Sequence, residues 1–247
     1  MENYNAKEVI DRLRSELCAV DVTHAGLRSF ADMPVMTHAF FPGGNGLYEG
    51  LEAKLFPYGG TLILGSNFGC VEKFIDANGV PLENDERDNP TWRSLLKRLR
   101  GANIKREKCF FTNAWPFLHE GSSNLNTVIK TWLCDQILMS SCAKFFEYAY
   151  AITKPRLIIA LGKGPAAFLS YIWPEELGPW RKYPVQNLND LPMASVCLQE
   201  QRAICVAITH PSMAHNAKRR RPPYSGEDGE IQLLIEARLE GERISNE

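Results

Sequence analysis

Four short apolar runs, separated by stretches with helical spacing, are the feature that most constrains the fold of this chain. They lie at residues 61–65, 109–114, 156–161 and 203–208. Continuous apolar runs of this length are typical of strands that are covered on both faces of a sheet. Because strands and helices alternate along the chain, the connections favour a parallel sheet. We therefore predict an α/β fold, a three-layer sandwich with a central four-stranded parallel sheet and helices on both faces.

The segments around these runs supply the helical layers of the predicted fold. Apolar residues at helical spacing predict helices near residues 6–18, 90–101, 124–153, 165–172 and 229–240. The segment 124–153 is long enough for one helix or two. We interpret residues 173–195 as a loop insertion before the last strand.

Length and composition indicate one folded unit. The chain has 247 residues, of which 45% are hydrophobic, and a single domain of this size buries a large fraction of its surface. No internal repeat, low-complexity tract or long linker divides it. We predict one domain over residues 1–247, with an N-terminal helical extension over about residues 1–57. We expect it to act as a monomer.

Charge and cysteine content bear on partners and compartment. The net charge of −1 neither requires nor excludes nucleic acid, because a local patch matters more than the sum. No run of about 18 apolar residues exists, and residues 1–5 lack the layout of a secretory signal, so we expect no membrane span. The seven cysteines form no C-x-x-C pair. This favours a reducing compartment, the cytoplasm, or the nucleus if the source is a eukaryote.

Polar residues stand where three of the apolar runs end. The first run is followed by the turn Gly65-Ser66-Asn67-Phe68-Gly69, the second contains Thr112-Asn113, and the fourth leads into His210-Pro211-Ser212. Ligand sites of open α/β sheets lie at the carboxyl ends of the strands. These three strand ends are therefore the candidate functional residues.

The order and sequence of these strand ends resemble the motifs of the uracil-DNA glycosylase superfamily, over about residues 58–215. The Asn in the first motif is closest in style to the mismatch-specific and single-strand-selective branches. The resemblance implies a DNA glycosylase of base excision repair, which flips uracil or a related deaminated base out of DNA and hydrolyses its N-glycosidic bond with a positioned water. No Lys stands at a nucleophile position, so the implied enzyme is monofunctional.

The resemblance gives the first turn a role in catalysis and in base binding. Asn67 would position the attacking water, which an amide can hold without acting as a general base. The turn's backbone N–H groups would bind the carbonyl edge of the pyrimidine; the other turn residues are Gly65, Ser66, Phe68 and Gly69. Phe68 stands where the family usually has Pro, a departure in sequence that bears on the shape of this turn.

The same resemblance assigns the reading of the base to three other positions. The amide of Asn113 would donate to uracil O4 and accept from N3–H. His210 would donate to uracil O2 as negative charge develops on the departing base. Leu82 in Gly79-Val80-Pro81-Leu82 stands where the family usually places a Phe that stacks under the flipped base, a second departure.

Contacts to DNA are implied for the loop after His210 and for two basic segments. Ser212 would contact phosphate, and Met213 would enter the minor groove as an apolar wedge. Lys163, at a predicted helix start, could help to hold a phosphate. The run Lys218-Arg219-Arg220-Arg221 is interpreted as a phosphate clamp.

Two alternatives to a glycosylase stay open at this point. Phe68 and Leu82 leave room for a non-catalytic protein of the same fold that binds nucleic acid or a nucleobase. A Rossmann-like nucleotide-binding enzyme is disfavoured, because neither G-x-G-x-x-G nor a Walker loop follows any strand. We expect no cofactor or metal; the Fe–S cluster of some superfamily branches needs C-x-x-C pairing that this chain lacks.

Overall fold

The structure is a computed structural model of the whole chain. It describes residues 58–67, 90–119, 125–182 and 188–244, together with Val9, Arg12, Leu13, Ser15, Glu16, Ala19, Leu27 and Arg28. The described residues of the predicted N-terminal helix include Val9 and Leu13, which are helical and buried.

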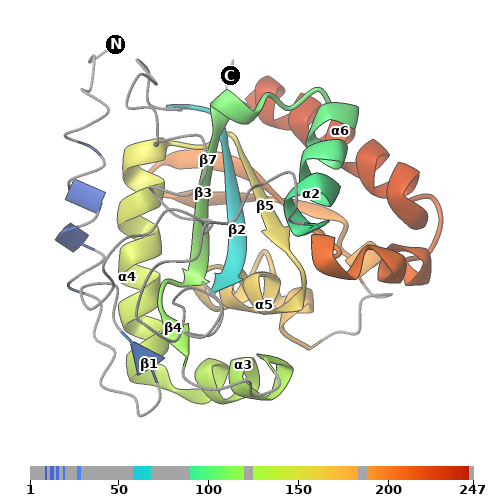
Figure 1. Cartoon of the computed structure of the whole chain (residues 1–247). Coiled ribbons are helices and arrows are strands. Elements are labelled where there is room, and N and C mark those ends of the chain that lie inside the picture. Colours follow the sequence, from blue (N-terminus) through green and yellow to red (C-terminus); the bar gives the residue numbers. More distant parts are fainter. Residues whose placement is uncertain are drawn as a thin grey trace, which may run out of the picture.

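A five-stranded sheet forms the centre of the molecule (Figure 1). Its strand order is β3-β2-β5-β7-β6. The strands are β3 (Cys109–Trp115), β2 (Thr61–Asn67), β5 (Leu157–Leu161), β7 (Gln201–Ile208) and β6 (Met193–Leu198). The first four pair in parallel and β6 pairs antiparallel to β7. A small separate sheet joins β1 (Leu27–Arg28) to β4 (Leu118–His119).

Helices cover both faces of the central sheet, so the predicted α/β sandwich is confirmed. In Figure 1, α4 stands on one side of the strands and α2 and α6 on the other, with α5 below. The helices are α2 (Pro90–Gly101), α3 (Leu125–Cys134), α4 (Gln136–Thr153), α5 (Lys163–Ile172) and α6 (Gly226–Ile244). The short 3-10 segments are η3 (Arg106–Lys108), η4 (Gly178–Lys182) and η6 (Pro211–Arg219).

The central strands form the core, as their apolar sequences predict. All five residues of β5 are buried, as are the last six residues of β7. Burying one Leu or Ile side chain contributes about 1.5–3 kcal/mol, so these strands supply much of the hydrophobic stabilisation. None of the described helices is long and apolar enough to span a bilayer.

The strand β6 corrects two parts of the prediction. It begins inside the segment 173–195, which was interpreted as a loop, and it raises the strand count from four to five. Of its six residues only Val196 is buried, between exposed neighbours, so it lacks the continuous buried run that marks the inner strands. The hairpin to β7 turns at Gln199 and Glu200, which both have positive φ.

The remaining boundaries lie near their predicted places. The segment 124–153 holds two helices, because Asp135 caps the second by accepting the Leu138 N–H at 2.9 Å. The strand β2 runs to Asn67, two residues beyond the predicted end at Gly65. This extension matters for the site, because it fixes Asn67 within the sheet instead of leaving it in a free turn.

Candidate functional site

The carboxyl ends of β2 and β3 bring the two candidate Asn residues to one edge of the sheet. Asn67 is the last residue of β2 and pairs in register with Trp115. Gly65 pairs in register with Asn113, which is 2% exposed. The parallel pairing therefore holds both amides on neighbouring strands, two residues apart along the ladder.

The end of β5 lies between this pair of strands and His210. Gly162 follows β5 with a φ of +91°, and a Cβ placed there would lie 3.0 Å from the Cβ of His210. A Cβ on Gly164 would lie 3.3 Å from Ser66 Oγ. The turn 162–164 thus contacts the end of β2 on one side and the start of the His210 loop on the other. Only glycine combines this close approach with a left-handed backbone at position 162.

Asn67 has a side-chain partner that the sequence did not reveal. Its Nδ2 lies 3.3 Å from Nδ1 of His119 in β4. His119 is buried, and its ring packs edge-on against Trp132 with centroids 6.2 Å apart. Because Nδ2 can only donate, Nδ1 of His119 accepts and its proton is on Nε2. The one available sequence signal was a polar residue three positions beyond Pro116, close after the second strand.

His210 is held as a neutral imidazole with a defined tautomer. Its Nδ1 accepts the backbone N–H of Ser212 at 3.3 Å and lies 2.7 Å from Ser212 Oγ. Burial, with the nearby charge of Arg98, lowers the pKa of His210 to about 4. The ring therefore carries its proton on Nε2 at neutral pH, where it can act as a hydrogen-bond donor.

Three buried polar atoms at this edge of the sheet have no hydrogen-bond partner among the residues that the structure describes. They are Thr112 Oγ1, Trp115 Nε1 and Thr209 Oγ1. Thr112 and Trp115 belong to β3, and Thr209 lies between β7 and His210. Buried polar groups are nearly always satisfied in proteins. Their concentration at the strand ends is typical of a place where a polar ligand or water completes the bonding.

The loop after His210 forms η6, with Pro211 as its first residue. Ser212 and Met213 are both exposed, Met213 by 46%. Ser212, which was predicted to contact phosphate, also bonds to the ring of His210. Met213 offers its apolar side chain to solvent directly beside the candidate catalytic His.

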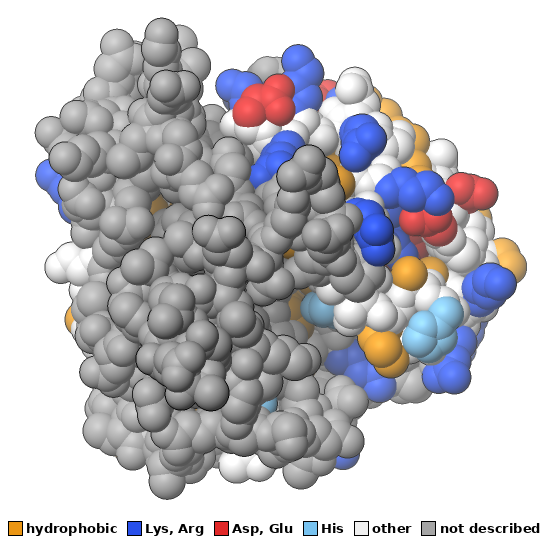
Figure 2. All heavy atoms as spheres, viewed as in Figure 1, with side chains coloured by type: hydrophobic (Ala, Val, Ile, Leu, Met, Phe, Trp, Pro, Cys, Tyr) orange, Lys and Arg blue, Asp and Glu red, His pale blue; other side chains and the backbone are white. Residues whose placement is uncertain are grey.

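The basic run 218–221 does not form one continuous clamp. Lys218 and Arg219 are exposed, and Arg221 forms an exposed ion pair with Asp190 at 2.9 Å. Arg220 corrects the prediction, because its side chain is buried and bonds to protein groups. The reason is the turn at the end of η6, which points one guanidinium of the run into the molecule. Figure 2 shows Lys and Arg side chains spread over the described part of this face, with acidic side chains among them.

The remaining predicted site residues divide into one that is described and three that are not. Lys163 is exposed at the first position of α5, where a helix N-terminus favours anions. Phe68, Gly69 and Leu82 lie outside the described residues.

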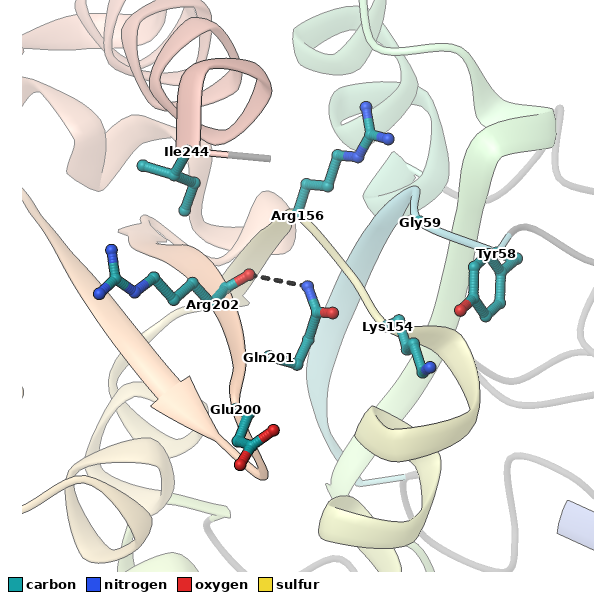
Figure 3. A pocket seen from close by; sticks show the side chains of 8 residues that line it. All are labelled: Tyr58, Gly59, Lys154, Arg156, Glu200, Gln201, Arg202 and Ile244. Atoms are coloured by element: carbon teal, nitrogen blue, oxygen red, sulfur yellow. Dashed lines mark hydrogen bonds between the residues drawn. The ribbon is translucent and has the colours of Figure 1, made fainter. Parts of the chain in front are cut away.

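Two open cavities lie at the opposite, amino-terminal edge of the sheet. One has a volume of about 490 Å³ and is lined by residues around the starts of β5 and β7 (Figure 3). The other, of about 450 Å³, lies against the starts of β2 and β5. Arg156 lines both cavities, and the ammonium of Lys154 lies over the Tyr58 ring at 5.6 Å. Neither contains any residue of the Asn67, Asn113 and His210 edge.

Comparison with known proteins places the chain in a family. The family model of the uracil DNA glycosylase superfamily matches residues 34–227. The match begins within the segment predicted as an N-terminal extension and ends at the start of α6. A search among curated proteins found no match. Because the model covers most of the chain and all five strands of the central sheet, the chain belongs to the uracil-DNA glycosylase superfamily.

Proposed function

We propose that this protein is a monofunctional DNA glycosylase that removes uracil, or a related deaminated base, from DNA. One observation carries the proposal. Asn67 on β2, Asn113 on β3 and His210 just after β7 are far apart in the sequence but lie at the same carboxyl edge of the sheet, joined through the turn after β5. Family membership supports glycosylase chemistry at this edge.

The site residues fit the charges that develop when an N-glycosidic bond breaks. The sugar becomes an oxocarbenium-like cation and the base leaves with negative charge. Neutral His210 would donate from Nε2 to uracil O2, where that charge grows. Asn113 would pair with O4 and N3–H of the base and reject bases with the opposite pattern of donors and acceptors.

Asn67 would hold the water that attacks the sugar, and His119 orients its amide. With Nδ2 directed at His119, Oδ1 is the atom of the amide that can accept a hydrogen bond from water. An accepting oxygen directs the water's lone pair toward the sugar carbon without removing a proton in the ground state. The water would lose its proton late, when the oxocarbenium ion makes it acidic, and this proton would neutralise the departing base anion.

The surface around His210 suits a DNA strand with an extruded base. Met213 is placed to fill the space in the stack, and Ser212 to approach a phosphate. Lys163, Lys218, Arg219 and Arg221 would contact the backbone. Arg220 is left out of this set because it is buried.

A direct assay separates this proposal from a non-catalytic binder. The protein is incubated with oligonucleotides that carry uracil, hypoxanthine or xanthine, each as a single strand and in a duplex. Abasic sites are detected by strand cleavage in hot alkali. A variant with Asn67→Ala and His210→Ala, purified in the same way, controls for contaminating glycosylases. Abasic sites with the native protein alone support the proposal; none on any substrate, with DNA still bound, supports the binder.

A further inference from the structure

Three charged side chains meet in the interior between α2, α6 and the end of η6. Arg98, Glu230 and Arg220 have side chains that are 0% exposed. Arg98 Nε lies 3.2 Å from Glu230 Oε2, and Arg220 Nη1 lies 3.4 Å from Glu230 Oε1. Arg98 also bonds to Ser94, and Arg220 bonds to Asn189 Oδ1 at 3.2 Å.

This buried cluster is bonded to the main chain that leads into His210. Glu230 Oε1 accepts the N–H of Thr209 at 2.7 Å, and Arg220 donates to the carbonyl of Ala207 at 2.8 Å. Between them, the carbonyl of Ile208 accepts the N–H of Gly162 at 2.8 Å. Three successive residues before His210 are thus each fixed by a group from a different part of the chain.

Packing alone does not account for such a cluster. Taking three charges out of water is costly, and apolar residues of similar volume often serve stability as well or better. The carboxylate does what an apolar side chain cannot, because it accepts the Thr209 N–H beyond the last residue of β7. The cluster therefore determines where the chain turns from the sheet into the His210 loop.

We infer that Glu230, held between Arg98 and Arg220, is a positioning residue that aims the His210 ring at the base through its bond to Thr209. The inference rests on the proposed glycosylase function. A ring that donates to the departing base must be placed to within a fraction of an ångström, and a displacement of about 1 Å can cost about 100-fold in rate.

The charge of the cluster acts on His210 in the same sense. Two guanidinium groups and one carboxylate leave a net positive charge beneath the loop, and the Arg98 charge opposes protonation of His210. Facing the ring from its own segment are the N–H and hydroxyl of Ser212, both bonded to Nδ1, and from the β5 end the backbone of Gly162. Because Nδ1 accepts from Ser212, the neutral ring carries its one N–H on Nε2, and the fixed main chain sets the direction of that N–H.

The test separates aiming from folding by replacing the whole cluster with apolar residues. The variant Arg98→Met, Glu230→Leu, Arg220→Met keeps side-chain volume and removes the acceptor of the Thr209 N–H. The matched control is Glu240→Leu with Arg243→Met, which replaces an exposed ion pair of 2.6 Å on the same helix with the same residue types. Single-turnover cleavage at saturating enzyme and the Kd for the same DNA are measured for each folded protein.

We expect the cluster variant to lose about 10- to 100-fold in cleavage rate, with its Kd within about threefold of the native value. The control should keep both values. A cluster variant that melts cooperatively and cleaves at the native rate overturns the inference. If that variant does not fold, Arg98→Met with Glu230→Leu takes its place, since it removes the acceptor of the Thr209 N–H and keeps the net charge of the cluster, and the same two outcomes apply.

A second readout keeps this inference distinct from the proposed function. In the native protein, the Thr209 amide should exchange slowly with solvent and the His210 ring should give one sharp set of NMR signals. In the cluster variant, the amide should exchange at least tenfold faster and the ring signals should broaden or multiply. If the native protein cleaves no damaged base, the proposed function fails, and the NMR measurement alone tests the positioning role. Amide exchange and ring signals that are the same in the cluster variant as in the native protein then overturn that role.

Discussion

The side chains of Asn67 and His119, which are 52 residues apart in sequence, are hydrogen-bonded through Nδ2 and Nδ1 at 3.3 Å. The bond joins the end of β2 in the central sheet to β4 in the small sheet. It gives the amide of Asn67 one orientation out of the two that an Asn can adopt. A water held by this side chain would therefore meet an acceptor at a fixed position.

Replacing Asn67 by Ala should remove catalysis and spare binding. Water positioning acts in the chemical step and contributes little to ground-state affinity. We expect the single-turnover rate to fall by about 10² to 10³, with the Kd for damaged DNA nearly unchanged. An unchanged rate would remove Asn67 from the mechanism.

Replacing His119 by Phe should lower the cleavage rate less than the loss of Asn67 does. The Phe ring keeps the packing on Trp132 but cannot accept from Asn67 Nδ2. Loss of one such hydrogen bond corresponds to about 1 kcal/mol, or roughly fivefold in rate. In the Asn67→Ala background, the same change should have no further effect on the rate. An equal loss in both backgrounds would show that His119 acts independently of Asn67.

The ring of His210 should stay neutral across the physiological pH range. Its folded-state pKa of about 4 lies below its unfolded value of about 6.5. The unfolded chain therefore binds this proton first, and the free energy of unfolding should fall as the pH drops from about 6.5 towards about 4. NMR of the ring should show no titration between pH 8 and 5.5 in the folded protein, and titration near 6.5 in urea. A folded-state midpoint above pH 6 would contradict the neutral donor.

The residues of the run 218–221 should respond differently to replacement. Arg219→Ala should weaken binding to damaged and undamaged DNA alike and lower the slope of log K against log salt by about one unit. Arg220→Ala should instead destabilise the fold by about 3–5 kcal/mol, because it leaves part of the Glu230 charge uncompensated in the interior. Salt-dependent binding and thermal melting of both variants distinguish the two. A melting temperature for Arg220→Ala equal to that of Arg219→Ala would contradict the buried role.

Replacing Met213 by Ala should affect duplex and single-stranded substrates unequally. The side chain is 46% exposed beside His210 and is proposed to refill the stack after the base leaves it. Cleavage of a duplex should slow, while cleavage of a single strand is spared, since an unpaired base leaves no stack to refill. The same damaged base is compared in both contexts. An equal loss in the two would exclude an intercalating role.

The sequence was sufficient to predict the sandwich and the edge of the sheet at which the candidate site residues lie. The inner strands are covered on both faces, so nearly all of their residues are apolar. Such a continuous run is visible in the sequence before the order of the strands is known. The edge strand β6 was missed, since an edge strand needs few buried residues and only Val196 of β6 is buried. The parallel order of the inner strands followed from the alternation with helices.

The sequence predicted the role of a residue only where the end of a strand determined its position. Asn67 and His210 follow apolar runs and Asn113 lies near the end of one, so their position at the carboxyl edge could be predicted from the order of strands and helices alone. What surrounds them could not. His119 becomes a partner of Asn67 only because β4 folds back beside the end of β2, and no local pattern records that approach.

The run of four basic residues shows most clearly the difference between what the sequence predicts and what the tertiary structure determines. The sequence determined that four cations follow one another after the His210 loop, and a surface patch was the natural interpretation. Only the tertiary structure decided that Arg220 turns inward to Glu230 while its neighbours face solvent. Glu230 and Arg98 come from α6 and α2, and their charges meet only when those helices pack together. Local sequence fixes strands and turns because they depend on neighbouring residues, whereas burial and charge pairing depend on groups that only the folded chain brings into contact.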